Sequence, residues 1–139
     1  MKKILFVDDE VPILDMIEEF FSEFGEEYKI YTANNGNEAL EILKHENIQV
    51  IVTDVQMPVM NGLELCREIR KFDQTSAIIA LTAFQKLFRY MQCRQEGFDD
   101  CLKKPFNPLE LKEIVDYSYK KISRWKQLFN EARKCGALN

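Results

Sequence analysis

Short apolar runs alternate with longer amphipathic stretches along the whole chain. Five runs have the length and composition of strands: Lys3–Val7, Tyr28–Thr32, Val50–Thr53, Ala77–Thr82 and the weaker Asp100–Lys103. Apolar residues at helical spacing predict helices over Pro12–Phe24, Gly36–Lys44, Gly62–Lys71 and Gln85–Glu96, and a last helix that begins after Asn107. The pattern is a strand followed by a helix, repeated five times.

This alternation predicts an α/β fold with a doubly wound, five-stranded parallel sheet and helices on both of its faces. The runs KILFV, VIVT and AIIALT are continuously apolar, as expected for strands that are covered on both sides. Open parallel sheets bind their ligands beyond the carboxyl ends of the strands. The residues that follow each strand are therefore the first place to look for chemistry.

Polar residues lie at the ends of four of the predicted strands. In chain order they are Asp8-Asp9-Glu10, then Asp54, then Thr82-Ala83, then Lys104-Pro105. Carboxylates about 5 Å apart repel by roughly 3 kcal/mol per pair at an effective dielectric of 20, and a divalent cation relieves that repulsion. A site with few carboxylates, all-oxygen ligands and open positions suits Mg²⁺, and a carboxylate can also attack phosphorus as a nucleophile.

Each of these residues also has an ordinary explanation when it is taken alone. Acidic residues are favoured in the first turn of a helix, Asp54 could cap the turn after it, and most lysines such as Lys104 are solvated. The Asn61-Gly62 pair is typical of a simple turn. The presence of all four groups at successive strand ends favours a single site.

The motifs ILFVDDE, DVQMPVMNG, LTA and KPF, in this order, resemble those of the receiver domain of bacterial two-component response regulators. The resemblance runs from Lys3 to about Lys121. It implies the flavodoxin-like or CheY-like strand order 2-1-3-4-5. It also implies a receiver domain over residues 1–121, followed by a C-terminal helical extension or linker over residues 122–139.

The resemblance implies a role for each residue that matches a motif. Asp54 is the phosphoacceptor, and Mg²⁺ is held by Asp8, Asp9, Asp54 and the main-chain carbonyl of Gln56, with Asp9 the closer ligand and Asp8 able to act through water. Lys104 pairs with the phosphoryl group or with Asp54, Thr82 with Ala83 beside it forms the switch, and the Lys104–Pro105 bond is cis, which an X–Pro bond adopts at modest cost.

One position departs from the family pattern. Receiver domains commonly carry Tyr or Phe three residues before the conserved lysine, and that ring moves inward with the switch hydroxyl. In this chain the position is Cys101. We consider Phe98, Phe84 and Phe88 as possible replacements for the missing ring.

Composition narrows the setting of the protein. A chain of 139 residues can bury one core, and a net charge of −4 gives no reason to expect direct nucleic-acid binding. Its four cysteines form no CxxC pair and it has one histidine, which argues against a zinc site. We find no signal peptide and no apolar run of membrane length, so we expect a cytoplasmic protein with reduced thiols and no membrane contact.

The C-terminal segment has a charge of its own. Six Lys and Arg against one Glu give residues 118–139 a net charge of +5, which leaves −9 for residues 1–117. A heptad-like seam runs through Leu111, Val115, Ser118, Ile122, Trp125, Phe129 and Ala132. The alternatives are an extension folded back on its domain, a linker helix to an output domain, or the seam of a homodimer or of a complex with a partner.

Together these observations predict a switch controlled by phosphorylation. A sensor histidine kinase or phosphotransfer protein would donate the phosphoryl group to Asp54 with Mg²⁺, and a downstream effector domain or protein would read the change. We do not expect an enzyme, beyond self-phosphotransfer and autodephosphorylation. The main rival, an aspartate-nucleophile phosphohydrolase, needs a D-x-D pattern after the first strand, and the chain has Asp8-Asp9-Glu10 there. A pure interaction module with a vestigial pocket is the third reading.

Overall fold

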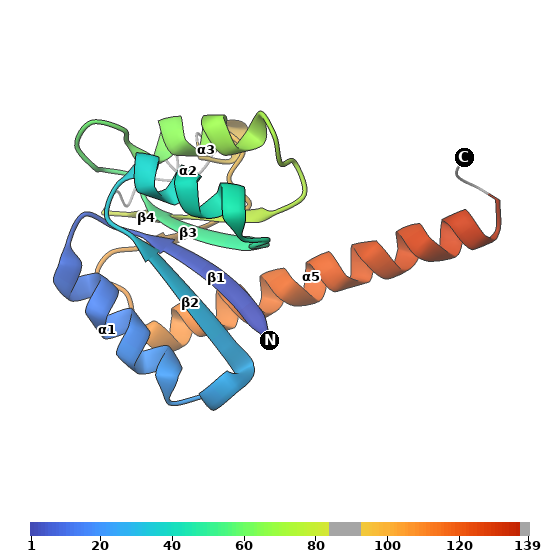
Figure 1. Ribbon diagram of the computed structural model, residues 1–139, viewed down its shortest axis with the longest axis horizontal. Coiled ribbons are helices and arrows are strands. Elements are labelled where there is room, and N and C mark those ends of the chain that lie inside the picture. The colour runs from blue at the N-terminus through green and yellow to red at the C-terminus, as the bar shows by residue number, and fades with distance from the viewer. Residues whose placement is uncertain (84–92, 137–139) are drawn as a thin grey trace.

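A computed structural model describes residues 1–83 and 93–136 (Figure 1). The strands are β1 (Lys2–Val7), β2 (Tyr28–Ala33), β3 (Val50–Asp54), β4 (Ala77–Thr82) and β5 (Asp100–Lys103). The helices are α1 (Val11–Ser22), the short 3₁₀ helix η1 (Gly25–Glu27), α2 (Gly36–His45), α3 (Gly62–Arg70) and α5 (Pro108–Lys134). The helix expected over Gln85–Glu96 lies mostly outside the described residues. Within the part of this range that the structure describes, residues 93–95 are helical.

The five strands form one sheet in the order β2-β1-β3-β4-β5, and every neighbouring pair is parallel. This confirms the doubly wound α/β fold that the alternation predicted and the strand order that the family resemblance implied. The order reverses between β1 and β3, and in open α/β sheets such a reversal leaves a crevice at the carboxyl ends of the two strands. β1 and β3 are the strands that end at Asp8 and Asp54.

The core consists of two apolar layers, one on each face of the sheet. Along β1, Leu5 and Val7 face the layer that contains residues of α2 and α3. Ile4 and Phe6, which alternate with them, face the layer that contains residues of α1 and α5. Because side chains alternate across a strand, a strand between two such layers must be apolar at every position.

Asparagines begin three of the helices at the edge of the sheet. The side-chain oxygens of Asn35, Asn61 and Asn107 accept hydrogen bonds of 2.8–2.9 Å from backbone N–H groups two or three residues further on. Such caps satisfy donors that the first turn of a helix would leave unpaired. They fix where α2, α3 and α5 start, and therefore the lengths of the loops that surround the strand ends.

A network around Asp116 holds the first third of α5 to the sheet. Its carboxylate accepts hydrogen bonds from the Tyr28 hydroxyl at 2.6 Å and from Lys2 and Lys112 at 3.0 Å. Burial alone would raise the pKa of Asp116, but these three donors outweigh it, so its pKa lies below the usual value. Burial and the bond to Asp116 raise the pKa of Tyr28 to about 12.

Beyond this network α5 continues as one helix that projects away from the sheet (Figure 1). Leu111, Val115 and Ser118 are buried against the domain. Further along the same seam, Trp125 is 67% exposed and Phe129 is 56% exposed. An extension folded back on its own domain is therefore not what the structure shows.

Candidate functional site

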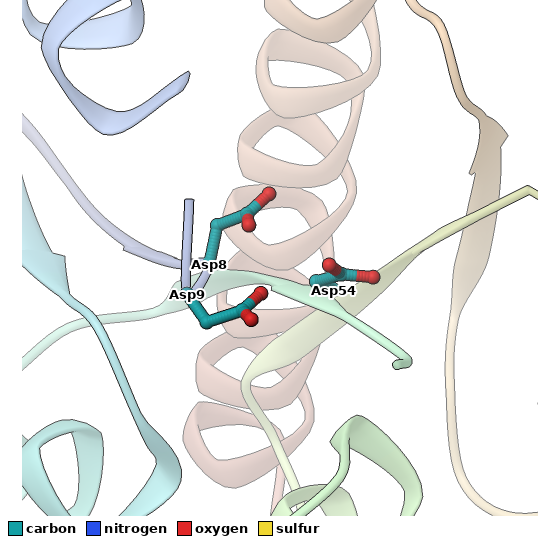
Figure 2. A group of neighbouring side chains, drawn as sticks. All are labelled: Asp8, Asp9 and Asp54. Atoms are coloured by element: carbon teal, nitrogen blue, oxygen red, sulfur yellow. The ribbon is translucent and has the colours of Figure 1, made fainter. Parts of the chain in front are cut away.

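Three carboxylates meet where β1 and β3 end. Asp8 and Asp9 directly follow β1, and Asp54 is the last residue of β3 (Figure 2). One oxygen from each of the three lies within 4.8 Å of the others. Asp8 and Asp54 are buried, with 0% and 5% of their surface exposed, whereas Asp9 is exposed. The cluster is thus open to solvent on the side of Asp9.

Lys104 forms an ion pair with each of the two buried carboxylates. Its Nζ donates to Oδ2 of Asp8 and to Oδ2 of Asp54, each at 2.9 Å. The backbone N–H of Lys104 donates to the carbonyl of Thr82 at 2.8 Å, which continues the pairing of β4 with β5 beyond the last residue of β5. Four strand ends therefore meet at one point of the sheet edge, as the sequence predicted.

The second oxygen of each buried carboxylate is also held. Oδ1 of Asp8 accepts from the backbone N–H of Glu10 at 2.9 Å, and Oδ1 of Asp54 accepts from that of Gln56 at 3.1 Å. Helix α1 begins only at Val11, so the acidic residues precede the helix. Their explanation as a first turn favoured by the helix dipole is therefore wrong.

Burial and charge act in opposite directions on the two partners of the ion pair. Burial, helped by the charge of Asp8, raises the pKa of Asp54 above its usual value, and the bonds from Lys104 and from the Gln56 N–H only partly offset this. Burial alone would lower the pKa of Lys104, but Asp54 and Asp8 outweigh it and raise that pKa. Lys104 therefore keeps its positive charge inside the site.

The other residues expected at the site lie around this pair. Thr82 is buried at the end of β4, and Ala83 after it is exposed. The Lys104–Pro105 peptide bond is cis, as expected, and Pro105 is exposed. The side chain of Gln56 is exposed on the loop that follows Asp54.

The sequence model of the response regulator receiver domain matches residues 4–116. The chain belongs to this family. It is a receiver domain of two-component signalling, with the five-stranded order that the family resemblance implied. Among the described parts of the chain, no helix is both long and apolar enough to cross a membrane.

Known relatives and solved structures agree with this assignment. The probable transcriptional regulator ycf27 of Cyanophora paradoxa is 40% identical over 114 residues, which cover 82% of this chain and 46% of the relative. The chain thus spans about half the length of the curated relatives it matches. A receiver domain protein from Clostridium thermocellum is 32% identical, with a TM-score of 0.79 over 92% of this chain and 99% of that one.

A solved structure of an adenylate cyclase from Rhodopirellula baltica matches a larger share of this chain. It is 27% identical, with a TM-score of 0.85 over 96% of this chain and 98% of that chain.

At the position where the family resemblance led us to expect a ring, the thiol of Cys101 lies in an apolar layer. Cys101 is half-buried on β5 and packs in the same apolar layer as Cys93 and Phe98. Burial and the neighbouring Cys93 raise the pKa of Cys101 to about 11. Phe98 is 4% exposed and is a core residue, whereas Phe84 and Phe88 lie outside the described residues.

Gly62 has a role in the receiver site that the sequence analysis missed. It begins α3, and a Cβ added there would lie 2.4 Å from the carbonyl oxygen of Asp54 and 2.8 Å from Cα of Val55. Its N–H donates to the carbonyl of Val55 at 2.9 Å. Only glycine allows α3 to come this close to the backbone of Asp54. The signal was the Asn61-Gly62 pair, which also suits an ordinary turn.

Val59 adopts a backbone conformation that valine rarely takes. Its φ is +70°, and the N–H of Met60 donates to the carbonyl of Pro58 at 2.8 Å across it. This is a γ-turn of the rare positive-φ type, in which a β-branched residue is strained. The side chain of Val59 is 92% exposed and gains little burial in return.

We expect Val59→Gly to raise the free energy of unfolding by about 1 kcal/mol. Glycine removes the strain of the positive φ, and its greater freedom in the unfolded chain offsets part of this gain. Chemical denaturation of both proteins measures the difference. Val59→Ala is the matched control, because it shortens the side chain but keeps the strained φ, and we expect a smaller gain. A Val59→Gly protein less stable than the wild type would contradict this account.

Proposed function

We propose that Asp54 accepts a phosphoryl group from a phosphohistidine of a sensor kinase or phosphotransfer protein. The observation that carries the proposal is one buried carboxylate at the end of β3, held beside a second buried carboxylate by a single half-buried lysine. A structural ion pair would need only one carboxylate for one lysine. The extra negative charge is explained by a cluster that binds a cation and a phosphoryl group in turn.

The transfer needs no redox chemistry or further reactant. A lone pair of one Asp54 oxygen forms the new bond to phosphorus, and the electrons of the breaking phosphorus–nitrogen bond leave with the donor imidazole. The ammonium of Lys104, 2.9 Å from Asp54, would stabilise the charge on the transferred oxygens. Hydrolysis of the acyl phosphate by water later restores the carboxylate.

The carboxylate set fits a magnesium ion. Asp8, Asp9 and Asp54 offer three oxygens within 4.8 Å of one another, and Mg²⁺ prefers oxygen ligands with several positions left to water and phosphate. We propose that these three residues and the main-chain carbonyl of Gln56 would hold the ion. When bound, the ion would neutralise the carboxylates and the incoming phosphoryl oxygens.

We further propose that Thr82 and Lys104 carry the phosphorylation signal to the outside of the domain. Phosphorylation changes the charge of Asp54 and adds acceptor oxygens beside both residues. Thr82 ends β4, and Lys104 follows β5 and is hydrogen-bonded to the Thr82 carbonyl, so both strands respond to the same group. A downstream effector domain or protein would read this edge, where Cys101 takes the place of the usual ring.

Intact mass measurement tests the proposed phosphoacceptor. The receiver domain is incubated with a small acyl phosphate and Mg²⁺, alongside Asp54→Asn and the matched control Asp15→Asn, which changes an exposed carboxylate on α1. We expect one added phosphoryl group on the wild type and on Asp15→Asn, and none on Asp54→Asn or when a chelator removes Mg²⁺. Persistence of the added group in Asp54→Asn, with its fold intact by circular dichroism, would overturn the assignment.

A further inference from the structure

The projecting half of α5 exposes a continuous apolar stripe. Trp125, Phe129 and Leu128 are 67%, 56% and 44% exposed, and Ile122 lies on the same side one turn nearer the domain. These four large side chains fall within eight residues of one helix. Scattered apolar residues are ordinary on a protein surface, but a contiguous stripe of this kind marks a surface that another molecule covers.

At its base the stripe forms one wall of a groove. Ile122, Trp125 and Phe129 line the helix side, and Gln74 and Thr75, in the segment between α3 and β4, line the domain side. A ligand lying along the stripe would therefore touch the receiver domain as well as the helix. A helix is convex and elongated, so it fits into a groove formed between α5 and the domain surface.

The charges beside the seam decide what kind of helix fits. Beside the heptad positions Ile122, Trp125, Phe129 and Ala132, the flanking positions are occupied by three cations and one apolar residue that widens the stripe: Lys121, Lys126, Arg133 and Leu128. None of them is acidic. In paired helices these flanking positions face each other, so opposite charges attract and like charges reject a partner. Two copies of this chain would place cations against cations in either a parallel or an antiparallel pair.

We propose that this groove and stripe bind an amphipathic helix of another protein whose apolar face is flanked by Asp or Glu. Lys121 at the inner end shares a neighbouring hollow with Asp99 and Asp100 of its own domain. Lys126 and Arg133, further out and exposed, are therefore the cations that meet the acidic partner. The proposal stands apart from the phosphorylation of Asp54 and does not depend on it.

Charge and shape favour a protein helix over an anionic membrane. A basic amphipathic helix binds lipid by lying flat in the interface. The groove between α5 and the segment that holds Gln74 and Thr75 is concave, and a flat bilayer does not enter it. Residues 1–117 also carry a net charge of −9, which anionic lipid would repel.

Fluorescence of Trp125 gives a direct test, because it is the only tryptophan in the chain. The full chain is titrated with two synthetic peptides that copy residues 115–136 and carry W125F, so that only the protein emits. The acidic peptide also carries K121E, K126E and R133E, and the control peptide keeps the basic residues. Vesicles with anionic headgroups form a third titration, and sedimentation equilibrium of the chain alone measures self-association.

We expect the acidic peptide to shift the Trp125 emission to shorter wavelength and to bind at least about tenfold more tightly than the basic peptide, with affinity that falls as salt rises. The exposed-site variant Lys126→Glu should weaken acidic-peptide binding about tenfold while its circular dichroism spectrum stays unchanged. Equal binding of the two peptides, no shift with the acidic one, a shift with vesicles alone, or a stable dimer of the chain would each overturn the proposal.

Discussion

Replacing Gly62 with alanine is expected to lower the free energy of unfolding by about 3 kcal/mol and to reduce phosphorylation of Asp54 strongly. The added Cβ would meet the carbonyl oxygen of Asp54 at 2.4 Å and Cα of Val55 at 2.8 Å, far inside van der Waals contact. Both atoms belong to the backbone of a buried strand end, which cannot rotate aside as a side chain can. The collision therefore moves either α3 or the proposed phosphoacceptor.

Gly36→Ala is the matched control for this experiment. Gly36 also begins a helix, but there an added Cβ would meet only side-chain atoms of Met60, with the sulfur at 2.5 Å, Cγ at 2.9 Å and Cβ at 3.1 Å. That flexible side chain can shift, so we expect a loss of less than about 1 kcal/mol and normal phosphorylation. Chemical denaturation and intact mass measure the two effects. If Gly62→Ala proved as stable and as reactive as Gly36→Ala, the close approach of α3 would not matter.

Lys104→Met is expected to lower the free energy of unfolding by about 3–5 kcal/mol in the absence of divalent cations. The change keeps much of the side-chain volume but removes the ammonium that lies 2.9 Å from both Asp8 and Asp54. Two carboxylates with 0% and 8% of their side-chain surface exposed would then repel each other without a counter-charge. Removing one partner of a buried ion pair leaves the other charge buried without compensation. The loss of folding free energy is therefore larger than the net stabilisation that the intact pair provides.

Two controls separate this electrostatic effect from a loss of packing. Lys103→Met changes the exposed neighbour of Lys104 and should leave stability within about 0.5 kcal/mol of the wild type. Adding Mg²⁺ should raise the unfolding midpoint of Lys104→Met more than that of the wild type, because the ion supplies the missing positive charge. Equal stability of Lys103→Met and Lys104→Met without Mg²⁺ would contradict the assigned role of the lysine.

Most of the sheet was predictable because its strands are covered on both faces. An uninterrupted apolar run such as that of β4 is typical of a strand covered on both faces. In the sequence an amphipathic segment follows each strand, as a parallel sheet requires. Element ends were less predictable. The first helix was expected to reach Phe24, but it ends at Ser22 and is followed by η1, in which Gly25 takes a φ of +64°. The exact end of a helix depends on which backbone N–H and C=O groups find hydrogen-bond partners in the folded chain.

The sequence alone was enough to predict the alternation of strands and helices, the family, and the residues that gather at the sheet edge. Those features depend on short-range patterns and on the rule that parallel strands end together. Three other features came only from the fold: the approach of Gly62 to the backbone of Asp54, the strained turn at Val59, and the exposure of the seam around Trp125. Each of them depends on how close segments of the chain come to one another in the folded protein. The sequence signals are ambiguous, because the same Asn-Gly pair or heptad spacing also occurs in turns and helices with different surroundings.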